Sequence, residues 1–390
     1  MKTHKRIEEI EVLRGIAVLA VFVYHGAALL YSPGVLAATI RSLHLELGVD
    51  LFFVISGFVI SRELIGSIEA ARAQGTMKSV VYAFWTRRAF RLLPSAWLSL
   101  AVLILIAFFY NSSGAAGSKW GNVWDALYAV VHLANFHWYQ CMWASAQCGV
   151  NPVYWSLSLE EQFYLLLPLV LVALGPRSIY FFVIACVVQI FTVRNGWSAT
   201  WIIRTDGLLM GVLLGYFSKT RAYEHVLMEA SKVRPLMWIA GLAILVLVPW
   251  NPTAHPLWIG ITAIFAGVLV LLASADKGLL MPAGVLRTAL TWVGSRSYAI
   301  YLFHVPVNLF VLESANRFLD TPSLAAGKYN ALLVASSFLL TMGLSNLNFR
   351  FVETPFRKVG STLSKRILAS AGSNSRRSGS LTVREQPAKR

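Results

Sequence analysis

Charged residues are scarce in this chain of 390 residues. Asp, Glu, Lys and Arg together make up 13% of the sequence, while hydrophobic residues make up 57%. A soluble domain of this size normally carries about 25% charged residues. The shortage of charge therefore excludes an ordinary soluble domain and favours an integral membrane protein.

Acidic residues are scarcer than basic ones. The sequence has 18 Asp and Glu but 34 Lys and Arg, which gives a net charge of +16. Such a basic chain raises the question of a nucleic-acid partner. In membrane proteins, however, positive charge usually marks the cytoplasmic loops. We therefore expect a lipid bilayer, and no nucleic acid, among the partners.

Alternating strand patterns are missing as well. The apolar runs between residues 11 and 350 are continuous, whereas a membrane β-barrel would alternate at every second residue. Because lipid leaves the backbone to satisfy its own hydrogen bonds, the sequence predicts an all-α integral membrane protein of about ten transmembrane helices. The candidate spans are 11–31, 47–63, 92–110, 154–174, 179–193, 203–218, 236–250, 256–274, 297–314 and 329–350.

Two apolar segments need a separate interpretation. The first span follows a short basic segment and resembles a signal peptide, but it has full spanning length and further spans follow, so we interpret it as a retained helix. Segment 122–137 is short and carries Asp125 and His132. We expect it to form an interfacial or re-entrant helix.

The positions of Lys and Arg predict the orientation. With the N-terminus in the cytoplasm, 28 of the 34 basic residues fall on the cytoplasmic side and 6 on the other. The positive-inside rule predicts this asymmetry, so we expect both termini in the cytoplasm. An eleventh span at 122–137 would spoil the pattern by placing the basic C-terminal segment outside.

The chain divides into two regions of different composition. Residues 1–358 hold all the predicted spans and form the transmembrane domain. Residues 359–390 are Ser-rich, basic and without periodicity, so we expect a disordered cytoplasmic tail. No soluble catalytic domain is expected in this sequence.

Cysteine is rare, with three in the chain. Cys141 and Cys148 lie in the loop 111–153, on the side predicted to be non-cytoplasmic, where a disulfide is permitted. The alternative is a pair of free thiols. Cys186 lies in a predicted span and is interpreted as packing. No metal site is expected.

The first span carries ionisable groups. Arg14 and His25 are eleven residues apart, which is about three helical turns, so both face the same way about 16 Å apart. Ionisable groups in spans are costly and usually face the protein interior. The alternative is a neutral histidine satisfied by one hydrogen bond, with Arg14 reaching the cytoplasmic edge.

An arginine cluster precedes the third span. Arg87, Arg88 and Arg91 occur in "FWTRRAFRLLPSAW", and Arg88 and Arg91 share a helical face. Guanidinium groups so placed can hold phosphate by bidentate contacts. Simple anchoring at the cytoplasmic surface explains the cluster equally well.

Two glutamates begin the apolar run "WSLSLEEQFYLLLPL". Ser158 and Glu161 fit the capping-box pattern S-x-x-E, which gives Glu161 a structural explanation. Glu160 has no such explanation and is a candidate functional carboxylate. The same stretch contributes Trp155 as a candidate supporting residue.

The remaining polar positions lie near the predicted outer ends of spans or inside them. Ser56 and the neighbouring Gly57 are best explained by close helix packing, and Glu353 by an ion pair with nearby basic residues. The other candidates are Asp50, Arg204, Asp206, Tyr298 and His304.

Together these groups suggest a chemistry. A histidine is the natural general base for a hydroxyl near neutral pH, and a carboxylate can orient it. His25, Glu160 and Asp50 are predicted in the outer half, with the arginines at the inner side. This layout suits transfer of a group from a phosphate-bearing cytoplasmic donor to an outer acceptor.

Seven stretches, in order, resemble the acyltransferase 3 family of bacterial membrane enzymes that O-acylate surface glycans and related compounds. They are "EVLRGIAVLAVFVYHG", "GVDLFFVISGFVI", "RRAFRLLP", "WSLSLEEQFYLLLP", "RTDGLLMGVLLG", "SRSYAIYLFHVPV" and "FRFVETPFRK".

The resemblance implies roles for particular residues. The family's Arg-x10-His motif falls on Arg14 and His25, with His25 as the catalytic base. Its Arg-x-x-Arg motif falls on Arg88 and Arg91 as contacts to the phosphates of acyl-coenzyme A, and Glu160 corresponds to an essential glutamate. Where many members have Asp, this chain has Glu11.

The resemblance further implies acetyl-coenzyme A as donor, a glycan hydroxyl as acceptor and a place in the bacterial inner membrane. Members with an additional extracytoplasmic domain complete the transfer there. This sequence contains none, so it would complete the transfer itself or pass the acyl group to a separate partner. A transporter or flippase without covalent chemistry is the competing class. A receptor or scaffold would leave the buried charges unexplained.

Overall fold

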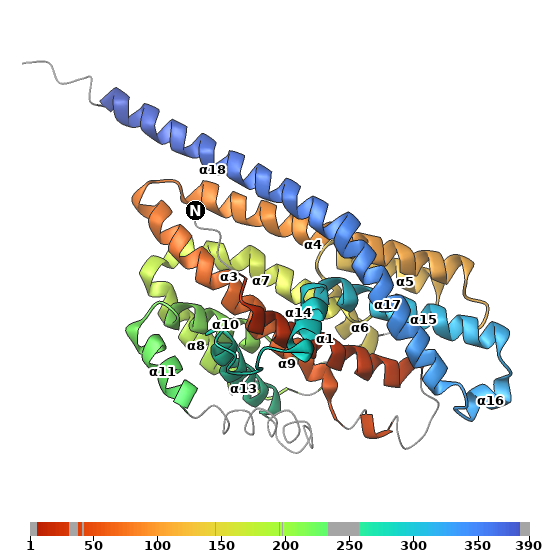
Figure 1. Cartoon of the computed structure of the whole chain (residues 1–390). Coiled ribbons are helices and arrows are strands. Elements are labelled where there is room, and N and C mark those ends of the chain that lie inside the picture. The colour runs from red at the N-terminus through yellow and green to blue at the C-terminus, as the bar shows by residue number, and fades with distance from the viewer. Residues whose placement is uncertain are drawn as a thin grey trace, which may run out of the picture.

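The computed structural model describes residues 6–30, 38–40, 43–144, 146–194, 196, 198–232 and 257–382, and in these residues the regular structure is entirely helical (Figure 1). The long helices are α1 (Glu8–Leu29), α3 (Gly48–Ala73), α4 (Met77–Phe109), α7 (Tyr154–Leu174), α15 (Ser297–Phe318), α17 (Asn330–Asn348) and α18 (Thr354–Thr382). The shorter ones are α5 (Lys119–Val130), α6 (Ala134–Trp143), α8 (Ser178–Ile190), α9 (Ala199–Ile202), α10 (Asp206–Phe217), α11 (Arg221–Lys232), α13 (Trp258–Ala273), α14 (Val285–Ser295) and α16 (Thr321–Ala325).

Six helical segments of the described chain are long and apolar enough to cross a membrane. Nine of the ten predicted spans coincide with helices, and the tenth, 236–250, lies outside the described residues. Three of the nine are short: α8 has 13 residues, α10 has 12 and α13 has 16. At about 1.5 Å per residue these fall short of a 30 Å hydrocarbon layer, so the number ten stays a prediction.

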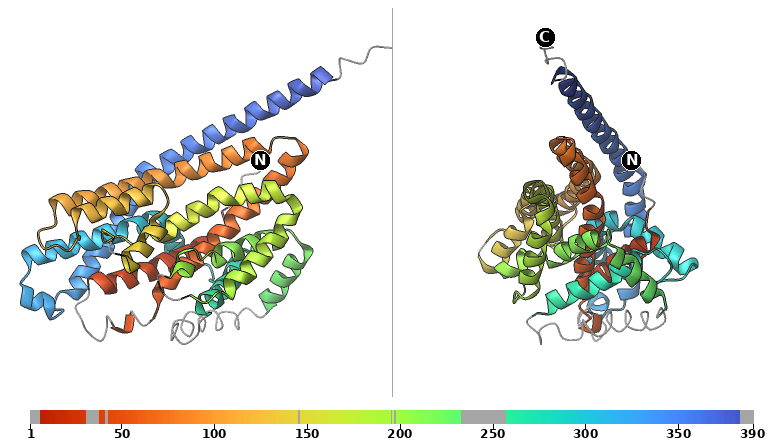
Figure 2. Two further views of the ribbon diagram at one scale, coloured as in Figure 1. Left: turned by 180° about the vertical axis from the view of Figure 1, so that it is seen from behind. Right: turned by 90° about the vertical axis from the view of Figure 1, so that its left-hand side faces the viewer.

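The connections gather on two sides of the bundle. The turn between α3 and α4 and the turn between α7 and α8 lie on the side of α11, whereas α16 lies on the opposite side (Figures 1 and 2). Successive long helices therefore run in alternating directions, as spans must, except that α18 continues in the direction of α17. Which side faces the cytoplasm stays a prediction.

Helices α3 and α10 approach each other closely. A Cβ atom placed on Gly57 would overlap the backbone carbonyl of Leu208, and one on Gly211 would overlap that of Val54. Small residues let helices approach in this way. The packing role predicted for Gly57 is therefore confirmed.

The C-terminal segment differs from its prediction. α17 continues through a π-helical turn (Phe349–Glu353) into α18, which extends to Thr382, whereas the sequence predicted a disordered tail from residue 359. The helix continues because it packs along α4. There Gly360 lies against Phe90, and Arg87 donates a hydrogen bond of 2.6 Å to Ser364. Residues 383–390 lie outside the described chain.

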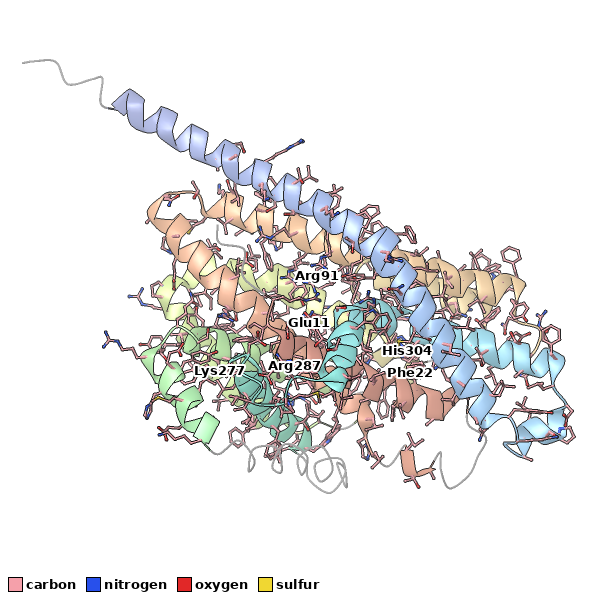
Figure 3. All side chains as sticks on the ribbon, viewed as in Figure 1. Glu11, Phe22, Arg91, Lys277, Arg287 and His304 are labelled. Carbon is pink, nitrogen blue, oxygen red and sulfur yellow. A yellow bond between two sulfur atoms is a disulfide. The ribbon has the colours of Figure 1, made fainter. Side chains whose placement is uncertain are left out.

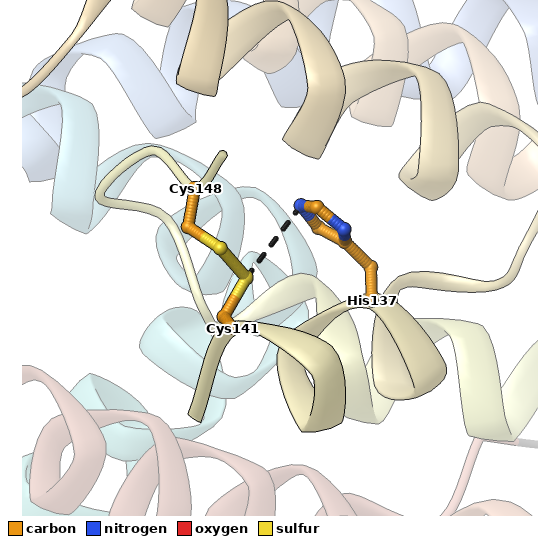
Figure 4. Close-up of side chains that lie close together, drawn as sticks. All are labelled: His137, Cys141 and Cys148. Carbon is orange, nitrogen blue, oxygen red and sulfur yellow. Dashed lines mark hydrogen bonds between the residues drawn. A yellow bond between two sulfur atoms is a disulfide. The ribbon is translucent and has the colours of Figure 1, made fainter. Parts of the chain in front are cut away.

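Segment 122–137 is divided between two helices, α5 and α6, with His132 between them in the left-handed region at φ 59°. The segment expected to form an interfacial or re-entrant helix is therefore two short helices rather than one, and its position in the membrane stays a prediction. Cys141 and Cys148 form the predicted disulfide beside His137 (Figure 4), and Cys186 is a buried free thiol. The disulfide ties the end of α6 to the chain that enters α7.

Candidate functional site

A large polar cavity opens among α1, α3, α4, α14 and α18. Its volume is about 650 Å³. Its lining contains more basic than acidic groups: Arg6, Arg14, Arg62, Arg88, Arg91 and Arg357, with Glu11, Glu63, Asp276 and Glu353. We call it the basic cavity. Such a surface suits a ligand that carries several negative charges.

A second, much smaller cavity of about 70 Å³ adjoins the first, and we call it the inner cavity. The two share the side chains of Arg14, Arg88 and Arg91 in their linings. Beyond the arginines the inner cavity is lined by apolar groups of α3 and by hydroxyl and carboxylate groups. These polar groups belong to Ser56, Ser156, Glu160, Tyr164, Ser297, Tyr298 and Tyr301. One passage thus runs from a basic opening to a mixed apolar and polar interior.

Two of the arginines lack an acidic partner. Arg88 and Arg91 form no ion pair with any residue that the structure describes, although Arg88 lies 5.6 Å from the ring of Phe84 and 5.5 Å from that of Tyr164. Arg14 has only a long ion pair of 3.9 Å with Glu11. These guanidinium groups are therefore available to an anionic ligand.

Arg87 points elsewhere, although the sequence grouped it with the cofactor-binding arginines. Its guanidinium hydrogen-bonds Ser364 and lies 3.8 Å from Glu63. The reason is helical geometry, because one residue of an α-helix turns the side chain by about 100°. Arg87 thus faces α18, while its neighbour Arg88 faces both cavities.

The two glutamates of α7 have different surroundings. Glu160 lines the inner cavity and accepts a hydrogen bond from the Tyr164 hydroxyl one turn later. Glu161 faces a separate small pocket with His132. The predicted capping box is wrong, because α7 begins at Tyr154. The Ser158 hydroxyl instead accepts a hydrogen bond from the backbone N–H of Ala134.

His25 has a partner that the sequence did not suggest. Its Nδ1 lies 3.0 Å from the carbonyl oxygen of Val21 and 3.2 Å from Nε2 of His304. The second histidine, on α15, is almost fully buried. In the described part of the chain neither Glu160 nor Asp50 hydrogen-bonds His25. The predicted orienting role of a carboxylate therefore has no contact to support it.

Asp50 belongs to a buried group of ion pairs. It lies 3.4 Å from Arg204, and Asp206 lies 3.3 Å from Arg194. The Arg204 guanidinium lies 4.6 Å from the ring centroid of Trp155 and 4.5 Å from that of Trp201, and the two rings contact each other with centroids 4.4 Å apart. We call Asp50, Arg194, Arg204 and Asp206 the ion-pair cluster. It joins α3 to the start of α10.

The residues predicted from the sequence fall into separate groups in the structure. Figure 3 shows Arg91 and Glu11, which both line the basic cavity, and His304 farther toward the side of the bundle on which α16 lies. The structure brings Arg14, Arg88, Arg91, Ser56, Glu160 and Tyr298 together in the cavities. It pairs His25 with His304, and places Asp50, Arg204, Asp206 and Trp155 in or beside the ion-pair cluster.

Several lining residues were missed by the sequence analysis, among them Ser156, Tyr164 and Tyr301. Tyr164 follows Glu160 at helical spacing, and the Ser156 hydroxyl lies 2.7 Å from that of Tyr301. All three stand inside the quoted motif stretches or directly beside the glutamates. Their spacing of four residues from Glu160, or three from His304, was the signal that could have identified them.

The fold and the site define a class of protein: helical membrane proteins in which a basic cavity leads to buried polar groups. Such a protein is suited to bind an anionic ligand at the membrane. Comparison with known proteins is more specific. The family model described as "Acyltransferase domain" matches residues 7–347. The chain therefore belongs to the acyltransferase 3 family. No solved structure matches it.

Relatives in two bacterial species carry related names. The "O-acetyltransferase OatA" of Staphylococcus aureus (strain NCTC 8325 / PS 47) is 28% identical over 371 residues, covering 89% of this chain and 57% of the relative. The "Peptidoglycan O-acetyltransferase OatA" of Listeria monocytogenes is 26% identical over 385 residues, covering 92% and 57%. The chain thus spans less than two thirds of the length of these relatives.

Proposed function

We propose that this protein is an integral membrane O-acetyltransferase that moves an acetyl group from acetyl-coenzyme A to a hydroxyl of a cell-envelope carbohydrate. Family membership and the names of the relatives support acyl transfer. The observation that carries the choice of donor is the pair of joined cavities with unpaired Arg88 and Arg91 at their junction. No metal is required by this chemistry.

The cavities suit the two parts of such a donor. The phosphates of coenzyme A would be held by Arg14, Arg88 and Arg91 through charge-assisted hydrogen bonds. The uncharged thioester arm would extend past them into the inner cavity, beside Glu160 and the hydroxyl groups. The basic opening would then face the cytoplasm of a bacterial cell, at its inner membrane, where acyl-coenzyme A is found.

The reaction needs one base. His25 takes the proton of the acceptor hydroxyl, and the hydroxyl oxygen forms a bond to the thioester carbonyl carbon. The carbon–sulfur bond breaks, and the leaving sulfur takes the proton back from His25, which yields an acetyl ester and free coenzyme A. The acceptor is either the carbohydrate itself or a group that relays the acetyl to it, with a separate extracytoplasmic partner in the second case.

The test is turnover of radiolabelled acetyl-coenzyme A by purified protein with candidate glycans. The wild type should release coenzyme A and label the glycan, whereas His25→Ala should do neither although it inserts and folds. His225→Ala is the matched control, since His225 is exposed on α11. A His25→Ala protein that still labels glycan would refute the mechanism. Binding without release of coenzyme A would favour a transporter.

A further inference from the structure

The pairing of two histidines from different helices allows an inference about proton position, which rests on the proposed function. His25 on α1 and His304 on α15 lie with ring centroids 4.9 Å apart. Each ring also contacts a backbone carbonyl of its own helix. A carbonyl oxygen can only accept, so these contacts report where each ring carries its hydrogen.

The chain of contacts begins at α15. Nδ1 of His304 lies 2.7 Å from the carbonyl oxygen of Tyr301, so this nitrogen carries a hydrogen and donates it. In a neutral ring the other nitrogen, Nε2, then has a lone pair. That lone pair lies 3.2 Å from Nδ1 of His25.

The same reasoning continues into α1. Nδ1 of His25 faces two acceptors, the lone pair of His304 and the carbonyl oxygen of Val21 at 3.0 Å. It must therefore carry the hydrogen of its ring. The remaining nitrogen, Nε2 of His25, is left with the lone pair that a general base requires.

We propose that His304 is a positioning residue that holds His25 in the tautomer with a free Nε2 and accepts a hydrogen bond from the imidazolium formed during transfer. It thus takes the place that a carboxylate occupies beside the base in Ser-His-Asp enzymes. In the part of the chain that the structure describes, neither ring is hydrogen-bonded to or ion-paired with a carboxylate or guanidinium. The other titratable groups against the pair are the phenols of Tyr24, on α1, and Tyr301, on α15.

The pair lies next to the proposed donor passage. Tyr301, whose carbonyl receives the His304 hydrogen bond, contributes its side chain to the inner cavity. The two histidines are therefore one helical turn beyond the cavity wall. A base held there would meet an acceptor that approaches from the side opposite the arginines.

Two variants of His304 distinguish a role in positioning His25 from a role in merely filling space. His304→Ala removes the acceptor, and we expect kcat to fall about 100-fold, within the usual contribution of a general base. His304→Gln keeps an acceptor oxygen near the position of Nε2 and should recover activity to within about tenfold of the wild type. Exposed His225→Gln is the control for an exchange of histidine elsewhere and should leave kcat unchanged.

The pH profile gives a readout that a purely structural role would not change. Because the acceptor stabilises protonated His25, its loss lowers the pKa of the base. In His304→Ala the rising limb of kcat/KM should therefore move to lower pH while the plateau falls. An unchanged limb in a folded His304→Ala protein, or Gln no better than Ala, would overturn the proposal.

A spectroscopic measurement keeps the inference testable without turnover. In protein labelled with ¹⁵N-histidine, His25 should show a protonated Nδ1 and an unprotonated Nε2 in the wild type. His304→Gln should preserve this tautomer, and a protonated Nε2 in the neutral wild type would contradict the inference. If the wild type transfers no acetyl group, the proposed function fails, while the tautomer is still decided by the spectrum.

Discussion

Arginines lie inside the helix bundle in two regions with opposite environments: Arg194 and Arg204 are buried, whereas Arg88 and Arg91 are partly exposed on the cavity walls. In the ion-pair cluster, Arg194 and Arg204 each lie within 3.4 Å of an aspartate oxygen. At the cavity junction, Arg88 and Arg91 have no acidic partner among the described residues. A buried charge needs compensation, which the aspartates supply in the first region. In the second region the arginines face a cavity, where an anionic ligand can reach them.

Because of this difference, we expect substitutions in the two regions to have different effects, on the stability of the fold in one case and on binding of the donor in the other. Removing a partner within the ion-pair cluster leaves a charge in the interior. Removing an arginine from the cavity takes away a charge that already lacks a partner. The first change should therefore act on the folded state and the second on the donor, and four predictions examine this division.

The largest effect is expected from Asp50→Ala. This change leaves the Arg204 guanidinium buried without its carboxylate, which should lower the free energy of unfolding by about 3–5 kcal/mol. Thermal unfolding of purified protein in detergent measures it. Asp50→Ala combined with Arg204→Met removes both charges and should restore most of the lost stability. A single variant that melts like the wild type would show that the pair is not needed.

Arg91→Ala should act on the donor instead. Loss of a charge-assisted hydrogen bond of about 1.5–3 kcal/mol should raise the KM for acetyl-coenzyme A about tenfold to a hundredfold. The melting temperature should not fall. Acetyl-pantetheine, which has no phosphates, provides the control, because its KM should be the same for both proteins. A similar rise in KM for both donors would disprove a phosphate contact.

Arg87→Ala provides a comparison with Arg91→Ala, because the two arginines lie about one helical turn apart on α4. Arg87 faces Glu63 and Ser364 rather than the cavities. A partly exposed ion pair contributes at most about 1 kcal/mol, so stability should change little. The KM for acetyl-coenzyme A should stay within about twofold of the wild type. A rise as large as that in Arg91→Ala would mean that simple clustering of charge, not direction, governs binding.

The smallest effect concerns a charge outside the spans. Asp320 caps α16, accepting hydrogen bonds from the Ser323 backbone N–H and the Tyr329 hydroxyl. The bonds from Ser323 and Tyr329 lower the pKa of Asp320 to about 2. Its stabilisation is therefore complete above pH 4 and is lost as the pH falls toward 2. Asp320→Asn should lower the melting temperature slightly at pH 7 but not at pH 2. Equal differences at both values would contradict the assignment.

The sequence predicted the helices well because lipid-facing runs have a strong hydrophobic signal. It failed where packing decides the outcome. The composition of residues 359–382 indicates disorder, yet α18 continues there along α4. Ser158 and Glu161 match a capping pattern, but the helix starts one turn earlier.

The same limit applies to the site. Local spacing predicted that Arg88 and Arg91 share a face, and both line the cavities. No spacing along the chain could show that His304 meets His25, because 279 residues separate them. Nor could it show that Asp50 is paired with Arg204, which lies in the connection between α9 and α10. Contacts between distant elements depend on the tertiary fold, which residue patterns do not contain.

The wall of the basic cavity combines the two ends of the chain. Arg6 and Arg14 come from its beginning, while Glu353 and Arg357 come from its last described part. During synthesis, these late residues emerge only after all the helices before them. The cavity wall is therefore completed only after the helices that precede residue 353 have been made, and chains that stop earlier lack part of it. Truncation before residue 353 should abolish donor binding even where the earlier helices assemble.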